Sequence, residues 1–130
     1  WQEYEGGGQE CIQLDACLDY IFPGYQPFDG AVCENVRITD NIFENVFAGV
    51  GSHSMIYDRP YRNIVIQGNT FRNVKKRAVW CLNYVDSAVE DNIIENAGGG
   101  VLVSCISRIP ILCQELLREW QETTRMRAFP

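Results

Sequence analysis

The sequence predicts an all-β fold, a right-handed parallel β-helix of about four rungs followed by a C-terminal α-helix. Three gapless segments share one pattern: NVRITDNIFENV at 35–46, NIVIQGNTFRNV at 63–74 and DSAVEDNIIENA at 86–97. Their common core, Asn-x-apolar-x-Asn, recurs at sequence intervals of 28 and then 23. Periods of roughly 20–50 residues are typical of solenoids and repeat arrays. Apolar and polar residues alternate within each segment, as they do in short strands.

Each repeat is expected to hold a second short strand, after the Asn pair and a brief turn. These strands begin with a small residue followed by alternating apolar residues. The segment at 11–15 has the same form, so we expect it to belong to an earlier rung. One rung of three short strands takes ~20–30 residues. The expected second strands lie at 49–53, 78–82 and 100–104.

The intervals between these strands are longer near the N-terminus than later in the chain. This excess predicts two inserted loops, at 16–34 and at 55–62. Insertions in a solenoid project from one face, which is often the binding face. Residues 1–106 are therefore expected to form the β-helix rungs and these two loops.

The repeated asparagines have a structural interpretation. Identical Asn side chains stacked ~4.8 Å apart can hydrogen-bond along the stack and satisfy backbone groups at the turns. We therefore expect them to specify the fold rather than the chemistry. The two columns are Asn41, Asn69 and Asn92, and Asn45, Asn73 and Asn96.

Composition excludes some classes of function. The chain has 130 residues, enough for one domain, and a net charge of −6, which disfavours nucleic acid as a partner. No apolar run is long enough to span a bilayer, so no membrane association is expected. The first residues lack an initiator Met and the features of a signal peptide, and we interpret the chain as a mature product or an excised fragment. The oligomeric state stays open.

The six cysteines form no CxxC pair, and His53 is the only histidine, so the sequence predicts no metal site. The even number of cysteines permits disulfides, but we expect mostly reduced, partly buried thiols. No cofactor is expected. Ca²⁺ would suit the plentiful Asp and Glu residues, but no compact loop of ligands indicates it.

The repeat over residues 10–106 resembles the parallel β-helix repeats of the pectate-lyase-like superfamily, a group of carbohydrate-binding and sugar-cleaving β-helices. The resemblance implies a polysaccharide or oligosaccharide as partner and an extracellular or cell-surface location. It leaves the activity open, because the group includes polysaccharide lyases, glycoside hydrolases, epimerases, phage tailspikes and surface proteins. In the segments IQLD, PFDG and GVGSHS, it points to Gln13, Asp15, Asp29 and His53 as site residues.

Strand alternation predicts two neighbouring columns of outward-facing residues. Asp15 is thereby expected beside His53 on the next rung, ~5 Å away. The carboxylate would raise the pKa of the histidine, and the two would form an acid/base pair. The columns are Gln13–Gly51–Trp80–Leu102 and Asp15–His53–Leu82–Ser104.

The first column has the features of a sugar-binding groove. Gly51 is expected to leave a gap between Gln13, which can hydrogen-bond hydroxyl groups, and Trp80, which offers a flat face for stacking. Lys75-Lys76-Arg77, just before the Trp80 strand, is expected to be a solvated turn.

The inserted loops supply further candidates for catalysis and binding. Asp29 lies in the first loop, and the second loop holds Tyr57, Arg59 and Arg62. The two arginines are candidates to bind uronate carboxylates in bidentate fashion, and Tyr57 is a candidate to contact the substrate or carry a proton.

Two catalytic mechanisms remain open, with a third, non-catalytic alternative. A glycoside hydrolase needs paired carboxylates, which Asp15 and Asp29 would supply. A polysaccharide lyase needs a base and a group that neutralises the uronate, for which His53 with Arg59 or Tyr57 would serve. The alternative is a glycan-binding, surface or scaffold module, or a fragment, with no activity of its own.

The C-terminal segment, 107–130, differs in style from the repeat. A helix is expected from Ile111 to about Arg127, with Leu112, Leu116, Leu117 and Trp120 on one side. Pro110 suits the first turn of this helix. Such a helix can cover the last rung of a solenoid. The other interpretation is that the tail is foreign to the family, through a truncated or shifted reading frame.

Overall fold

The computed structural model describes residues 9–15, 33–52, 60–105 and 126–129. All strand pairs in this part of the chain are parallel, which confirms the predicted all-β fold there. The described residues include no helix long and apolar enough to cross a membrane. The strands are β1 (Glu10–Gln13), β2 (Glu34–Thr39), β3 (Ile42–Val46), β4 (Ala48–Gly51), β5 (Tyr61–Gln67), β6 (Thr70–Leu82), β7 (Tyr84–Val85), β8 (Ala88–Glu90), β9 (Asn92–Ser104) and β10 (Met126–Phe129).

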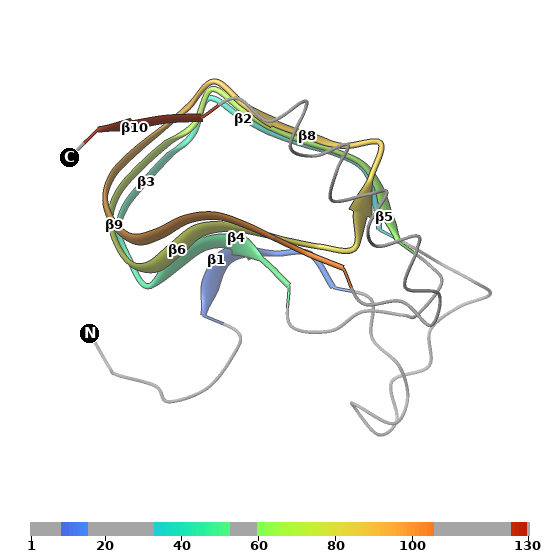
Figure 1. The fold of residues 1–130 in the computed structure, drawn as a ribbon, viewed down its shortest axis with the longest axis horizontal. Helices are drawn as coiled ribbons and strands as arrows, with labels where there is room; N and C mark the ends of the chain where they lie inside the picture. Colours follow the sequence, from blue (N-terminus) through green and yellow to red (C-terminus); the bar gives the residue numbers. More distant parts are fainter. Residues whose placement is uncertain (1–8, 16–32, 53–59, 106–125, 130) are drawn as a thin grey trace.

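The strands form two sheets, between which the chain passes back and forth. The larger sheet has the order β1-β4-β6-β9-β10, and β3 also pairs with β6. The smaller sheet has the order β2-β5-β7, and β8 also pairs with β5. In the described chain, every two strands that pair with each other are separated in sequence by at least one strand of the other sheet, except β9 and β10. Figure 1 shows the result: β3, β6 and β9 follow one another along one side, and β2, β5 and β8 along another.

The register of the strands follows the repeat. Phe43 pairs with Phe71, and Phe71 pairs with Ile94, at the same sequence intervals that separate the Asn pairs. This register stacks the Phe43 and Phe71 rings, whose centroids lie 4.6 Å apart with an angle of 7° between their planes. Equivalent apolar residues therefore pack on one another from strand to strand.

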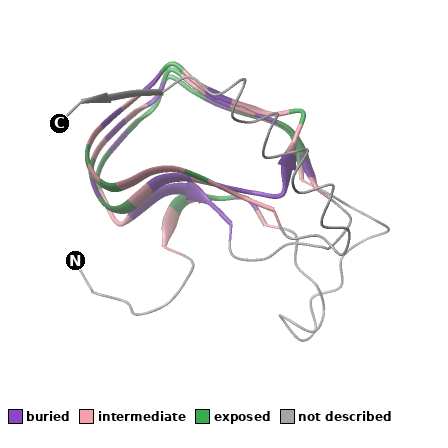
Figure 2. Ribbon diagram, in the orientation of Figure 1, coloured by how far each residue is buried: buried purple, intermediate pink, exposed green. Residues whose placement is uncertain are grey.

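The core contains apolar side chains from both sheets in one cluster. Ile64 and Ile66 of β5 and Phe71 and Val79 of β6 are fully buried. Figure 2 shows buried segments on both sides of the coil, with exposed residues between them. Strand alternation predicted that Leu14, Val50, Val79 and Cys81 face inward. All four belong to this core.

The corners of the coil are set by residues in the left-handed backbone conformation. All of the non-glycine described residues with positive φ are Asn or Asp, the side chains that best tolerate it. Most of them recur at the interval of the repeat, so that each repeat turns at equivalent places. Gly68 completes one of the columns with φ of 68°. The columns are Asn35, Asn63 and Asp86; Asp40, Gly68 and Asp91; and Asn45, Asn73 and Asn96.

The predicted structural role of the other asparagine column is confirmed. Asn69 Oδ1 accepts hydrogen bonds from the Asn41 backbone N–H, at 2.9 Å, and from Asn41 Nδ2, at 3.0 Å. Asn92 Oδ1 accepts the equivalent pair from Asn69. The amides of Asn69 and Asn92 also donate to the carbonyls of Ile38 and Ile66. Because Asn69 and Asn92 are fully buried, these bonds satisfy groups that water cannot reach.

The turn expected after each Asn pair is absent from the later repeats. β6 and β9 each run unbroken for 13 residues, because Asn73 and Asn96 bend the strand in the left-handed conformation without ending it. Lys75-Lys76-Arg77, expected to be a solvated turn, lies within β6. The sequence pattern of a turn here produces a bent strand, because neighbouring strands on both sides keep the pairing.

The predicted tail and loops are described only at their ends. Residues 106–125 lie outside the described part, and 126–129 form strand β10 rather than the end of a helix. β10 pairs with Asn92–Glu95 of β9, so the tail does contribute to the larger sheet. Of the expected loops, Glu34 belongs to β2, and Tyr61 and Arg62 belong to β5; most of the remainder lies outside the described residues.

The described cysteines are of two kinds. Cys11, Cys33 and Cys81 are free thiols, and Cys105 is in a disulfide bond. Burial raises the pKa of all three thiols, most strongly that of Cys81 in the core. The expectation of mostly reduced thiols therefore agrees with three of these four residues.

Candidate functional site

The first predicted column is present as a row across the larger sheet. Gln13 of β1 pairs with Gly51 of β4, and Trp80 of β6 pairs with Leu102 of β9. The pairing of Val50 with Val79 connects these two halves in the same register. We call Gln13, Gly51, Trp80 and Leu102 the row. Gln13 and Leu102 are exposed, and Trp80 is half-buried.

The gap expected over Gly51 is filled by Glu10. A Cβ added to Gly51 would lie 2.8 Å from Glu10 Cγ and 3.2 Å from Glu10 Oε1. Gly51 is accordingly buried, although it has no side chain of its own. The other carboxylate oxygen of Glu10, Oε2, is buried and has no hydrogen-bond partner among the described residues. Because Gly51 has no side chain, the Glu10 carboxylate of β1 occupies the space that was expected to be an open gap.

Trp80 is held by contacts on its edge and on one face. Its indole Nε1 donates a hydrogen bond to Ser104 Oγ at 3.0 Å. The Arg77 guanidinium carbon lies 4.4 Å from the centre of the indole ring, a cation–π arrangement. These contacts fix the orientation of the ring, and the Arg77 stack covers one of its two faces.

Asp15 lies at the end of β1, beside the row. Gln13 Nε2 donates a hydrogen bond to Asp15 Oδ2. Desolvation raises the pKa of the Cys33 thiol, and the charge of Asp15 raises it further. The ladder continues past β1, because the Leu14 N–H donates to the Gly51 carbonyl at 2.8 Å. His53, the predicted partner of Asp15, lies outside the described residues.

Of the other predicted site residues the structure describes Arg62, which it does not bring to the row. Arg62 belongs to β5 in the smaller sheet, where its guanidinium forms an exposed ion pair with Asp86. Asp29, Tyr57 and Arg59 lie outside the described residues. In the second column, Leu82 is 4% exposed and so packs into the protein instead of facing outward, while Ser104 supports Trp80.

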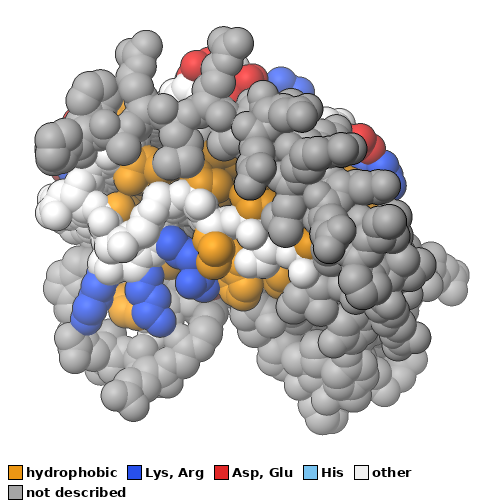
Figure 3. Space-filling model, viewed as in Figure 1, with side chains coloured by type: hydrophobic (Ala, Val, Ile, Leu, Met, Phe, Trp, Pro, Cys, Tyr) orange, Lys and Arg blue, Asp and Glu red, His pale blue; other side chains and the backbone are white. Residues whose placement is uncertain are grey.

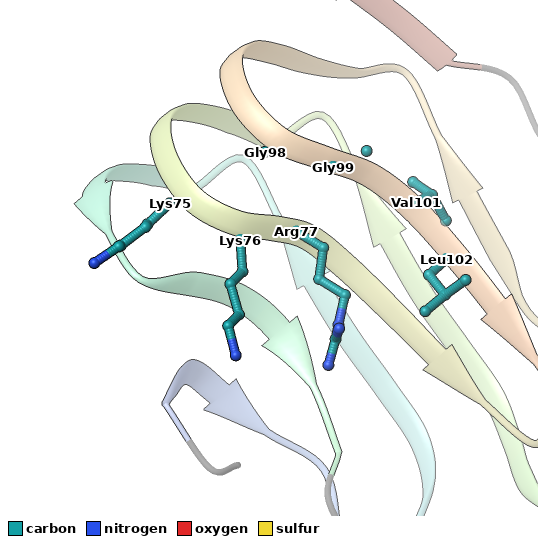
Figure 4. A pocket seen from close by; sticks show the side chains of 8 residues that line it. Lys75, Lys76, Arg77, Gly98, Gly99, Val101 and Leu102 are labelled. Atoms are coloured by element: carbon teal, nitrogen blue, oxygen red, sulfur yellow. The ribbon is translucent and has the colours of Figure 1, made fainter. Parts of the chain in front are cut away.

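A groove that the sequence analysis did not predict lies next to the row. Its volume is about 540 Å³, and it is open on one side. Figure 4 shows the Lys76 and Arg77 side chains projecting from β6 away from Gly98 and Gly99 of β9, with Lys75 turned to another side. We call it the β6 groove. Its lining residues are Lys75, Lys76, Arg77, Gly98, Gly99, Gly100, Val101 and Leu102.

A β-bulge in β6 forms one wall of this groove. Val74 pairs with Ala97, but Arg77 pairs with Gly99, so β6 holds one residue more than β9 in this stretch. On the other side of β6, the Lys76 N–H donates to the Phe47 carbonyl at 2.7 Å. Gly98 allows the close approach, because a Cβ there would lie 2.4 Å from the Lys75 carbonyl oxygen.

The bulge was legible in the sequence as a change in the repeat interval. Phe43, Phe71 and Ile94 in the first strands of the repeats follow the same intervals as the Asn pairs. From Val50 to Val79 the interval is longer by one, and from Val79 to Val101 it is shorter by one. The middle repeat therefore has one extra residue between its two apolar segments. That residue falls in the Lys75–Arg77 stretch, whose charge had predicted a solvated turn.

The cations of the groove are held by aromatic rings. Lys75 Nζ and Lys76 Nζ lie 5.7 and 4.9 Å from the centre of the Phe47 ring. For Lys76 and Arg77 no carboxylate lies within ion-pair distance in the described part of the chain. Arg77 Nε is buried and has no hydrogen-bond acceptor among the described residues. By contrast, Arg72 on the same strand is paired with both Glu44 and Glu95.

The arrangement can bind polar ligands but offers no metal site in the described residues, where no three His, Cys, Asp or Glu side chains cluster. The β1 end of the row supplies an amide and two carboxylates, from Gln13, Glu10 and Asp15. The β6 end supplies an oriented indole ring and cations. A carboxylate accepts hydrogen bonds from hydroxyl groups, and an amide both donates and accepts them. A fixed aromatic ring offers a stacking surface.

Comparison with known proteins gives no match of sufficient significance to any family model, curated protein or solved structure.

Proposed function

We propose that the chain is a stretch of right-handed parallel β-helix, and that its row is the face on which it binds a polysaccharide. The fold part of the proposal is supported by two parallel sheets whose strands alternate in sequence. When a strand returns to a parallel neighbour in the same sheet, the connection is right-handed in nearly all proteins. The three columns of left-handed corner residues at matching intervals are the further support.

The single observation that carries the binding proposal is the register that aligns Gln13 and Trp80 in one row. The row crosses four strands, which at ~4.8 Å per strand gives a linear surface of ~14 Å. A polysaccharide is a linear ligand that presents hydroxyl groups and flat ring faces, and binding sites for such ligands combine apolar surface with a few placed polar groups. The resemblance of the repeat to carbohydrate-active β-helices agrees with this choice of ligand.

Catalysis is the finer part of the proposal. Asp15, hydrogen-bonded to Gln13 at the end of the row, is the proposed catalytic carboxylate, with His53 or Asp29 as its partner. The reaction would be hydrolysis or elimination of a glycosidic bond. The second candidate is binding without turnover. It is favoured by the contact of Glu10 with Gly51, which fills the part of the row where a sugar would otherwise lie deepest.

A panel of polysaccharides, followed by affinity electrophoresis, tests binding. Trp80→Ala is expected to weaken binding about tenfold through the loss of ~1.5 kcal/mol of stacking. Ile42→Ala is the matched control, because Ile42 is an apolar residue of the same sheet, 71% exposed and outside the row. Gln13→Ala, an exposed position, keeps the test open if Trp80→Ala fails to fold. Wild-type chain that binds no polysaccharide in the panel would contradict the proposal.

The same panel separates enzyme from binding module. Products are scored for new reducing ends and for unsaturated sugars, which distinguish hydrolase from lyase. If the chain is an enzyme, Asp15→Asn and His53→Ala lose turnover while they retain binding and a folded circular dichroism spectrum. Binding with no product from any substrate would establish the non-catalytic candidate.

A further inference from the structure

We propose that residues 2–6 of this chain dock as a strand along the edge of β3 that faces away from β6. Together with β1 they would complete one more repeat of the coil. The occupant of this edge is thus a segment of the same chain, which lies outside the described residues. The docking is independent of the proposed function, because it involves the edge of β3 and not the row.

The described strands leave one side of β2 and β3 open. β2 pairs with β5 alone and β3 with β6 alone in the described part of the chain. Val36 and Val46 are only partly buried, whereas their partners in the next repeat, Ile64 and Val74, are at most 2% exposed. Ile42 of β3 is 71% exposed. Figure 3 looks onto one end of the coil and shows hydrophobic side chains near its middle. A further strand beside β3 would cover this side of the core.

The open edge of β3 presents a backbone donor. The Thr70 N–H donates to the Asn41 carbonyl at 2.8 Å. One repeat further on, the Ile93 N–H donates to the Asn69 carbonyl at 2.9 Å. Because the peptide between Asn41 and Ile42 is trans, its N–H points opposite to its carbonyl, away from β6. The Ile42 N–H therefore calls for a carbonyl one repeat before Asn41.

The asparagine column is open at the same end. Asn69 Oδ1 accepts two hydrogen bonds from Asn41, and Asn92 Oδ1 accepts two from Asn69. Asn41 Oδ1 accepts none within the part of the chain that the structure describes. Asn41 is exposed, whereas Asn69 and Asn92 are fully buried. The missing donors are a backbone N–H and a side-chain amide from one residue in the preceding repeat.

Residues 2–6 have the pattern of the segment that lies beside β3 on its paired side. They read Gln-Glu-Tyr-Glu-Gly, and residues 69–73 read Asn-Thr-Phe-Arg-Asn. In both, a side-chain amide comes first, an aromatic residue third, and a residue that tolerates the left-handed conformation fifth. Asn73, in the fifth place, has φ of 53°. Gln2 would then supply both donors that the column lacks and the carbonyl for the Ile42 N–H.

The spacing to β1 supports the same alignment. Ile12 and Val79 lie in one column across β1, β4 and β6. Tyr4 precedes Ile12 by the same interval that separates Phe71 from Val79. Tyr4 is therefore the residue that falls beside Phe43, whose ring stacks on that of Phe71 with centroids 4.6 Å apart. A tyrosine ring in this place would extend the aromatic stack by one member.

This alignment puts one more residue between Tyr4 and β1 than the chain has between β3 and β4. β6 contains the same extra residue, as its bulge. Gly7 and Gly8 align with the start of that bulge, and glycine adopts the conformations of a bulge at little cost. Without the extra residue, Glu5 would face Phe43, and burial of a carboxylate without a partner is unfavourable. The register with Tyr4 inward is therefore the one we adopt.

The connection to β1 favours this chain's own segment over a second copy. Residues 7–9 alone separate the proposed strand from β1, and β1 already pairs with β4. β3 itself leads into β4 with Phe47 alone between them, so the proposed strand and β1 would follow the same course. A segment tied this closely has a local concentration of roughly millimolar, which a second copy reaches only in concentrated solution.

Amide hydrogen exchange of the full chain, resolved by residue with NMR, tests the docking. The Ile42 N–H is expected to exchange at least about tenfold more slowly than in an unstructured peptide. Tyr4→Ser should remove most of this protection, because it takes the ring from the Phe43 column. Glu5→Ser is the matched control at the neighbouring, outward-facing position and should change the rate by less than about twofold. The Thr70 N–H, which bonds to the Asn41 carbonyl, should stay protected in every sample and so reports folding.

A second variant acts through the backbone. Gly6→Val places a β-branched residue at the left-handed corner, where its side chain is strained. It should expose the Ile42 N–H as Tyr4→Ser does, with Thr70 again protected. It serves if Tyr4→Ser also lowers the protection of Thr70.

The contrary results are distinct. An Ile42 N–H that exchanges as in an unstructured peptide, while Thr70 is protected, would overturn the docking. Protection that neither Tyr4→Ser nor Gly6→Val reduces would show that another segment covers the edge. A larger effect of Glu5→Ser than of Tyr4→Ser would refute the register. Protection that rises with protein concentration would assign the edge to a second copy, against the proposal.

Discussion

Asn69 shows how one buried polar side chain can specify a stacked fold. Its carboxamide receives two hydrogen bonds from Asn41 and donates to Asn92 and to the Ile38 carbonyl. All of these partners come from neighbouring passes of the chain and are distant in sequence. A shift of register by one residue would leave the buried groups without partners, so the column selects one register.

Asn69→Ala is expected to lower the free energy of unfolding by ~3 kcal/mol, because it strands the Asn41 N–H and the Ile38 carbonyl without partners. Asn41→Ala, at the exposed end of the same column, is expected to cost less than ~1 kcal/mol. Urea denaturation of the two variants measures the difference. Similar losses for both would show that burial of the column does not matter.

Cys81 predicts a dependence of stability on alkaline pH. Burial raises the pKa of this thiol above its ordinary value of 9.0, and burial likewise raises that of the Tyr84 hydroxyl above 10.0. Above about pH 9 the unfolded chain releases protons that the folded chain retains, so the free energy of unfolding falls as the pH rises. Cys81→Ala removes the thiol whose pKa is raised most and should make the fall shallower between about pH 9 and 10.5. The free energy of unfolding of both proteins is measured by urea denaturation across this pH range. An equal fall with pH in both would refute this assignment.

At the scale of elements, strand β6 determines the shape of the site. It is the central strand of the described sheet and contacts β3 and β4 on one side and β9 on the other. Its bulge interrupts the pairing with β9 between Val74 and Arg77, and Trp80 follows shortly after. One inserted residue therefore shapes this wall of the groove, and Arg77 beyond it stacks on Trp80 of the row.

Gly98→Ala tests the packing of the bulge. The new Cβ would lie 2.4 and 2.9 Å from the carbonyl oxygens of Lys75 and Lys76, and backbone cannot move as easily as a flexible side chain. We expect a loss of ~2 kcal/mol or more in the free energy of unfolding. Gly99→Ala, the neighbouring control, should change stability by less than ~0.5 kcal/mol. Thermal unfolding of both variants measures the two changes in stability. A Gly98→Ala variant as stable as the wild type would contradict the close approach of Gly98 to the bulge.

The sequence predicted the parts of this fold that repeat and missed those that depend on a single contact. Alternation and spacing were enough to pair Gln13 with Gly51 and Trp80 with Leu102, because register follows from periodicity. The position of Glu10 over Gly51 has no periodic pattern. The turn expected at Lys75–Arg77 failed because a left-handed Asn can bend a strand that neighbours keep paired.

At the scale of the whole molecule, each element is stabilised mainly by its neighbours in the stack. β6 pairs with β3 and β4 from the preceding repeat and with β9 from the following one, and the core is one cluster shared by both sheets. Stacked parallel strands provide a surface that a linear ligand can cross from strand to strand. The proposed polysaccharide site depends on this stacking.

The most direct test of the stacking is the pattern of inter-strand contacts in nuclear Overhauser spectra of the folded chain. Parallel stacking predicts contacts between residues whose numbers differ by a constant along each regular stretch of paired strands. These are Phe43 with Phe71 and Phe71 with Ile94 before the bulge, and Val50 with Val79 and Val79 with Val101 beyond it. Antiparallel pairing would instead give contacts between residues whose numbers have a constant sum. Observation of that second pattern for β6 would contradict the coil, the row and the groove together.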